Sequence, residues 1–200
     1  MKPAGAPAES ELTRWYVLLA MCLVYTLSIA DRYVTSTVLD PIRIELQLSD
    51  SGIAFLTGPA LAWFYVLLGF PLAWLIDRSH RRNIIAASVI LWSAMTAWTG
   101  VARTQWTFLL ARMGVGIGEA GGTPGANSIL SDYFSVARRP MALTIFSLGA
   151  PLGAYLAASV AGHIADRYGW RAVFLALGIP GVLLGLIILV TVRELSLIHI

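Results

Sequence analysis

The chain has 200 residues, of which 58% are hydrophobic and 12% are charged, and its mean hydropathy is +0.74. A soluble domain of this length does not need so apolar a composition, so we expect an integral membrane protein. The formal charge of +3 does not indicate nucleic-acid binding here, because the basic residues cluster in loops between apolar segments, where they report topology. The single cysteine, Cys22, excludes an internal disulfide and a cysteine metal cage.

Six apolar segments follow a Pro- and Ala-rich tail, and each is close to the roughly 20 residues that a helix needs to cross the hydrocarbon. We expect residues 1–14 to be a disordered tail and residues 15–193 to form one helical bundle. The transmembrane helices are expected at 15–39, 52–76, 83–102, 105–131, 140–164 and 171–192.

Lysine and arginine are distributed unequally between the two sets of loops. Eight of them fall on the side of the N-terminus, and four on the other side. The positive-inside rule therefore predicts a multi-pass protein of the cell (inner) membrane with a cytoplasmic N-terminus. Aromatic residues near the span ends predict membrane-interface anchors at Trp15, Tyr16, Trp106, Tyr133 and Trp170.

Two segments carry features that affect helix packing. Small residues recur every four positions in the fifth segment and predict a close helix contact along Gly149, Gly153, Ala157 and Ala161. Pro124 and Pro151 predict bends in the fourth and fifth segments.

Four charged side chains lie inside apolar segments: Asp31 and Arg32 in the first, Arg112 and Glu119 in the fourth. Each charge at the bilayer centre costs roughly 2.5–3.5 kcal/mol on insertion scales. We therefore expect these residues to pair, to face a watery cavity, or to change protonation.

Helical spacing places these charges on polar stripes. Ser28, Asp31 and Thr35 share one face of the first helix, and Arg112 and Glu119 share one face of the fourth. We predict that the two stripes meet, with Asp31 and Glu119 as protonatable groups that compete for the permanent cation Arg112. The alternative is a fixed ion-pair network that only holds the two helices together.

The loops contain an internal repeat. The motif Asp-Arg-x-x-x-Arg begins at Asp77 after the second segment and at Asp166 after the fifth, 89 positions later. Because these loops are predicted on opposite sides of the membrane, the motif indicates an inverted repeat of three helices plus three.

The loop after the second segment resembles the signature of the major facilitator superfamily, Gly-x-x-x-Asp-Arg/Lys-x-Gly-Arg/Lys-Arg/Lys. Four of its six defined positions match, with Ala73 and His80 standing where the family usually has glycine. The resemblance implies an all-α integral membrane fold of six transmembrane helices in a 3+3 inverted repeat, half of a twelve-helix transporter. It also implies a conformational latch between the halves, formed by Asp77, Arg78, Arg81 and Arg82. The alternative, a solvated loop that obeys the positive-inside rule, accounts for the arginines but not for Asp77.

The remaining motifs resemble the spinster branch of this family. They are Asp31-Arg32-Tyr33, the glycine-rich run from Arg112 to Ala126, Ser131-Asp132-Tyr133-Phe134 and Gly169-Trp170-Arg171. The resemblance implies a secondary transporter that couples protons, through Asp31, Arg112 and Glu119, to movement of an amphipathic or anionic, lysolipid-like solute. Substrate contacts are expected at Arg32, Arg112 and Tyr25.

Two other functions compete with this interpretation. The anion:cation symporter branch, which carries organic acids, also has an Asp-Arg pair in helix one and an Arg and a Glu in helix four. A non-transporting membrane subunit or receptor would use the embedded charges for assembly. We expect no enzyme, cofactor or metal site, because His80, His163 and His199 have no metal-ligand spacing.

The segment 194–200 is anomalous for a transporter half. Leu195-Ser196-Leu197-Ile198-His199-Ile200 is not a polar linker and resembles translated sequencing-adapter read-through. We therefore expect an N-terminal fragment whose partner is a missing C-terminal half; the alternative is a half-transporter that works with a second copy.

Overall fold

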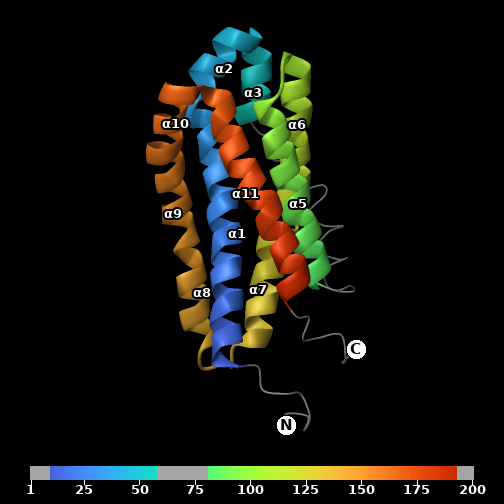
Figure 1. Ribbon diagram of the computed structural model, residues 1–200, viewed down its shortest axis with the longest axis vertical. Helices are drawn as coiled ribbons and strands as arrows, with labels where there is room; N and C mark the ends of the chain where they lie inside the picture. The colour runs from blue at the N-terminus through green and yellow to red at the C-terminus, as the bar shows by residue number, and fades with distance from the viewer. Residues whose placement is uncertain (1–9, 58–80, 193–200) are drawn as a thin grey trace.

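The computed structural model describes residues 10–57 and 81–192, and every regular element within these two ranges is a helix (Figure 1). Long helices run side by side along the long axis, and α2 and α3 lie at the end opposite the N-terminus. The helices are α1 (Glu11–Thr37), α2 (Leu39–Leu46), α3 (Asp50–Thr57), α5 (Arg81–Gly100), α6 (Gln105–Glu119), α7 (Gly122–Tyr133), α8 (Arg139–Ser147), α9 (Gly149–Tyr155), the π-helical turn η1 (Leu156–Val160), α10 (Ala161–Tyr168) and α11 (Trp170–Thr191).

Four helical segments in the described part of the chain are long and apolar enough to cross a membrane: α1, α5, the continuous run Arg139–Tyr168, and α11. They coincide with the first, third, fifth and sixth predicted spans. Of the second predicted span, α3 covers only the beginning, and residues 58–76 lie outside the described residues.

The fourth predicted span, 105–131, is not one helix. It consists of α6, with 15 residues, and α7, with 12, and the interruption falls at Ala120 and Gly121. Pro124 lies in the first turn of α7, where its missing N–H is tolerated, so the break occurs before the proline and not at it.

The fifth span packs against α1 through its small residues, as predicted. A Cβ atom built on Gly153 would lie 2.5 Å from the Thr26 carbonyl oxygen and 2.9 Å from the Ile29 Cβ. Ala157 and Ala161 on the same stripe are buried. The absence of a side chain at Gly153 therefore lets the two backbones approach closely.

Antiparallel α5 and α11 are joined at both ends by arginines. At one end Arg82 Nη1 donates to the Val192 carbonyl (3.4 Å), and at the other Arg171 Nη2 donates to the Ala102 carbonyl (2.9 Å). Carbonyls just beyond a helix end lack an intrahelical donor. Each arginine is the last residue of one copy of the repeated motif. Arg82 of α5 supplies a donor just beyond the end of α11, and Arg171 of α11 supplies one just beyond the end of α5.

Two apolar clusters divide the bundle along α1. One surrounds Met21, Trp92 and Phe146, and the other surrounds Phe108 and Phe174. Three of the buried polar residues of α1, Thr26, Ser28 and Asp31, lie between the stretches of α1 that enter the two clusters. The fold thus holds a polar layer between two apolar ones.

Candidate functional site: a buried charge cluster between α1 and α6

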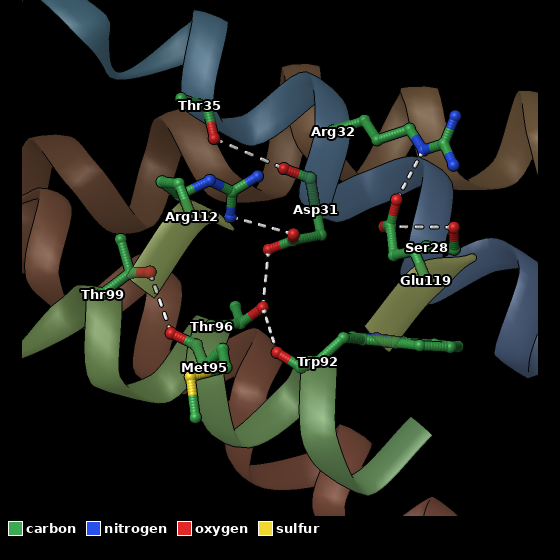
Figure 2. A network of polar contacts seen from close by, with 10 residues as sticks. All are labelled: Ser28, Asp31, Arg32, Thr35, Trp92, Met95, Thr96, Thr99, Arg112 and Glu119. Atoms are coloured by element: carbon green, nitrogen blue, oxygen red, sulfur yellow. Dashed lines mark hydrogen bonds and ion pairs between the residues drawn. The ribbon is translucent and has the colours of Figure 1, made fainter. Parts of the chain in front are cut away.

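The four embedded charges form one site, shown in Figure 2. We call Asp31, Arg32, Arg112 and Glu119 the charge cluster. Asp31 and Arg32 belong to α1, and Arg112 and Glu119 to α6. The prediction that the two polar stripes meet is therefore confirmed.

Asp31 and Arg112 form the more deeply buried ion pair. Arg112 Nη1 donates to Asp31 Oδ2 at 2.9 Å, and the two side chains are only 4% and 3% exposed. The guanidinium carbon of Arg112 also lies 5.9 Å from the centre of the Phe174 ring. Little solvent can reach this pair, so its electrostatic interaction is screened far less than that of a surface pair.

Glu119 pairs with Arg32. Arg32 Nε donates to Glu119 Oε2 at 2.8 Å, and Ser28 Oγ donates to Glu119 Oε1 at 3.2 Å. The carboxylate is 5% exposed, whereas the arginine is 46% exposed. This second pair therefore joins a buried acid to a partly accessible cation.

In this structure each acid has its own arginine, Arg112 for Asp31 and Arg32 for Glu119, and the competition of both acids for Arg112 stays a prediction. Helical side chains lean toward the N-terminus of their helix, so the long side chain of Arg32 reaches back to the level of Ser28, where Glu119 lies. Asp31, with a shorter side chain, meets Arg112 instead.

A hydroxyl group from a third helix completes the site. Thr96 of α5 is buried, and its Oγ1 lies 3.0 Å from Asp31 Oδ1 and 3.0 Å from the Trp92 carbonyl oxygen. Thr96 lies outside the polar stripes that the sequence predicts. Thr35, on the predicted stripe, donates instead to the Asp31 main-chain carbonyl at 3.5 Å.

The chemistry available to the charge cluster is proton exchange. Arginine stays protonated in proteins and cannot accept a hydrogen bond, so only the two carboxylates can gain or lose a proton. Protonation of either acid would remove the charge that holds its arginine.

The other predicted site residues lie apart from these contacts. Tyr25 stacks on Phe146 of α8, with ring centroids 4.8 Å apart. Arg81 Nη1 forms an ion pair with Asp132 Oδ2 of α7 (2.5 Å), and Arg82 contacts Val192 as described above. The other two predicted latch residues, Asp77 and Arg78, lie outside the described residues.

A second polar contact, far from the charge cluster, joins α2 to α11. Trp170 Nε1 donates to Glu45 Oε2 at 2.7 Å, and Arg171 Nη1 donates to Glu45 Oε1. These hydrogen bonds, first from the Trp170 indole and then from Arg171, hold the pKa of Glu45 below its usual range. Trp170 is buried, and so is Tyr133, so the prediction that these two residues anchor the membrane interface is wrong.

Replacing Glu45 by glutamine is expected to destabilise the fold at neutral pH but not in acid. A carboxylate with a lowered pKa stabilises the folded state above its unfolded pKa, and this contribution disappears as the pH falls below about 4. Thermal unfolding of wild type and Glu45→Gln in detergent, compared across pH, measures the effect. Asp40→Asn, an exposed acid of the same helix, is the control. A difference that stays constant from acid to neutral pH would contradict the prediction.

Comparisons with known proteins agree with this fold. Residues 21–196 match the model of the Major Facilitator Superfamily. An efflux pump of Mycolicibacterium smegmatis, described as MFS-type, is 32% identical over 89% of the chain and 42% of its own length. A probable galactarate/D-glucarate transporter of Bacillus subtilis, GudP, is 31% identical over 96% of the chain and 43% of its own length.

The crystal structure of a bacterial homolog of the human lysosomal transporter spinster, inward-facing and unoccupied, has a TM-score of 0.84 and 39% identity. The match covers 94% of the chain and 45% of that structure. The chain thus spans less than half the length of these relatives. In agreement with the sequence-based expectation, the family is one of transporters and not of enzymes. The chain is a multi-pass membrane protein that belongs to the major facilitator superfamily, in its spinster-like branch.

Proposed function

We propose that the charge cluster couples proton movement to transport of an amphipathic or anionic small molecule by alternating access. The observation that carries this proposal is the Asp31–Arg112 pair, which lies almost completely buried between two apolar clusters of a transporter fold. A purely structural pair of this kind contributes little net stability, since desolvation offsets its attraction.

Protonation supplies the conformational step. When Asp31 gains a proton, its charge interaction with Arg112 is lost, and the contact that ties α1 to α6 weakens. When Glu119 gains a proton, its charge interaction with Arg32 is lost in the same way. The interrupted span formed by α6 and α7 can then change its position relative to α1, which is a population shift driven by the proton.

The substrate is proposed to be an amphipathic, lysolipid-like anion, and its head group would meet Arg32. This arginine is partly exposed, so an anion can reach it. Tyr25 and Arg112 are the further proposed contacts. The alternative is an organic acid, favoured by the likeness to a relative named as a probable galactarate/D-glucarate transporter.

The proposed setting is the inner membrane with a cytoplasmic N-terminus. Among the described arginines, Arg14, Arg81, Arg82, Arg138 and Arg139 lie at the beginnings of α1, α5 and α8, and these helix ends share the side of the bundle that would be cytoplasmic. A second six-helix unit, either a C-terminal half or a second copy, would complete the transporter. Asp77, Arg78, Arg81 and Arg82 would latch the two units.

The test uses proteoliposomes with an imposed pH gradient. They hold the chain either alone or joined to the C-terminal six helices of a spinster relative, and uptake of a radiolabelled lysophospholipid is compared with uptake of glucarate. Asp31→Asn and Glu119→Gln are expected to abolish the response to the gradient. Asp50→Asn, which removes an exposed acid paired with Arg43, is expected to leave it unchanged.

A full response to the gradient in both Asp31→Asn and Glu119→Gln would overturn the proposed coupling. Glucarate uptake without lysophospholipid uptake would favour the organic-acid alternative. No transport of either solute in any preparation would favour a membrane subunit or receptor, for which the cluster is an assembly contact.

A further inference from the structure

The two oxygens of Asp31 face different kinds of partner. Oδ2 accepts from Arg112 Nη1, and Oδ1 is 3.0 Å from Thr96 Oγ1. A guanidinium nitrogen only donates, whereas a hydroxyl both donates and accepts. The difference between these partners determines where a proton can be held.

A proton on Oδ2 would point at the N–H group of Arg112, which cannot accept it. A proton on Oδ1 can be donated to Thr96 Oγ1, provided that the threonine hydrogen turns elsewhere. The Trp92 carbonyl oxygen lies 3.0 Å from Thr96 Oγ1 and can accept that hydrogen. No other rearrangement is needed.

We propose that Asp31 Oδ1 is the atom that takes the proton and that Thr96 is a positioning residue whose hydroxyl reverses its direction when it does. With Asp31 ionised, Thr96 donates to Oδ1. With Asp31 protonated, Oδ1–H donates to Thr96, and Thr96 donates to Trp92. The threonine keeps its own proton throughout. This inference rests on the proposed proton coupling at Asp31.

Few other ionisable groups lie close enough to Asp31 to hold the proton in its place. The charged groups close to Asp31 in the described structure are Arg112 and Glu119 from α6 and Arg32 from α1. α9 and η1, which pack on α1, contain no Asp, Glu, Lys, Arg or His. The charged or imidazole groups of α5, α7 and α11 lie toward the helix ends, and those of α8 and α10 lie toward the two ends of the continuous run Arg139–Tyr168.

Because Thr96 is buried, a water molecule cannot readily substitute for its hydroxyl group. Thr96 and Trp92 are each 2% exposed, so a water molecule has little access to the position of Thr96 Oγ1. Without this hydroxyl a protonated Asp31 would bury an unpaired O–H donor, which is costly in an apolar environment.

A matched pair of variants tests the proposal. Thr96→Val removes the hydroxyl and nearly preserves side-chain shape, and Thr96→Ser retains it. Thr99→Val is the control, because Thr99 is equally buried on the same helix but, among the residues that the structure describes, its hydroxyl donates only to the Met95 carbonyl of its own helix.

Infrared difference spectra between acidic and alkaline buffer are recorded on the full chain in lipid nanodiscs. The carbonyl stretch of protonated Asp31 is identified by its absence in Asp31→Asn. In Thr96→Val this band is expected at higher frequency, because the O–H group has lost its acceptor; Thr96→Ser and Thr99→Val are expected to keep the wild-type frequency. An unshifted band in Thr96→Val, or no band attributable to Asp31 at any pH, overturns the proposal.

Transport gives an independent readout. Thr96→Val is expected to lower gradient-driven uptake roughly tenfold, the effect of losing one hydrogen bond of ordinary strength, with recovery in Thr96→Ser. If Asp31→Asn abolishes coupled uptake while Thr96→Val matches Thr99→Val, the role of Thr96 fails and the proposed function stands. If Asp31→Asn retains coupled uptake, the inference at Asp31 fails. If Glu119→Gln retains it as well, the proposed function itself fails.

Discussion

Replacing Arg112 by leucine is expected to lower the free energy of unfolding by about 3–5 kcal/mol, the usual cost of breaking a buried ion pair from one side. The substitution leaves Asp31 at 3% exposure without its cation. Thermal or denaturant unfolding in detergent micelles measures the loss.

Two further variants distinguish the loss of the buried ion pair from nonspecific destabilisation of the fold. The double variant Arg112→Leu/Asp31→Asn removes both charges and is expected to recover most of the stability without recovering proton coupling. Arg81→Leu breaks a partly exposed ion pair with Asp132 and is expected to cost no more than about 1 kcal/mol. Equal losses in Arg112→Leu and Arg81→Leu would show that burial does not govern these pairs.

Adding one methyl group at Gly153 is expected to destabilise the bundle by about 1–3 kcal/mol, the usual cost of overpacking. The new Cβ would lie 2.5 Å from the Thr26 carbonyl oxygen and 3.0 Å from the Ala30 nitrogen, both main-chain atoms that cannot rotate away. Relief therefore requires α9 to move away from α1. The midpoint of thermal unfolding of Gly153→Ala reports this change.

Gly162→Ala is the matched control in the same span. A Cβ atom there has nothing within 4 Å, so the substitution is expected to stabilise the helix by up to about 1 kcal/mol through helix propensity alone. Opposite signs for the two glycines would support the close contact between α9 and α1. A stabilising Gly153→Ala would contradict it.

The sequence was sufficient to find the charge cluster, but not to assign its pairs. Embedded charges are conspicuous because each is costly in lipid, and helical spacing placed them on facing stripes. Which arginine meets which acid depends on side-chain length and on the stagger of α1 against α6. Arg32 reaches Glu119 because its side chain is long and because the stagger of α1 against α6 places Glu119 at the level of Ser28. The spacing of residues in the sequence gives no information on how this reach and this stagger combine.

Other features were hidden for local reasons. A threonine in an apolar helix usually bonds its own helix at the carbonyl four residues back, so Thr96 looked like Thr99 in the sequence. Only the approach of α1 distinguishes the two. Trp170 lies near a span end, where anchors are common, but its neighbours Phe108 and Phe174 and its bond to Glu45 bury it.

The arginine contacts at the two ends of α5 and α11 limit how this half can deform. Because Arg82 holds one end and Arg171 the other, sliding of one helix along its partner would break a contact at each membrane surface. The pair therefore resists sliding of α5 against α11. Bending can instead be taken up where regular helix is interrupted: at Pro180 inside α11, at the break between α6 and α7, and at the π-helical turn of the fifth span.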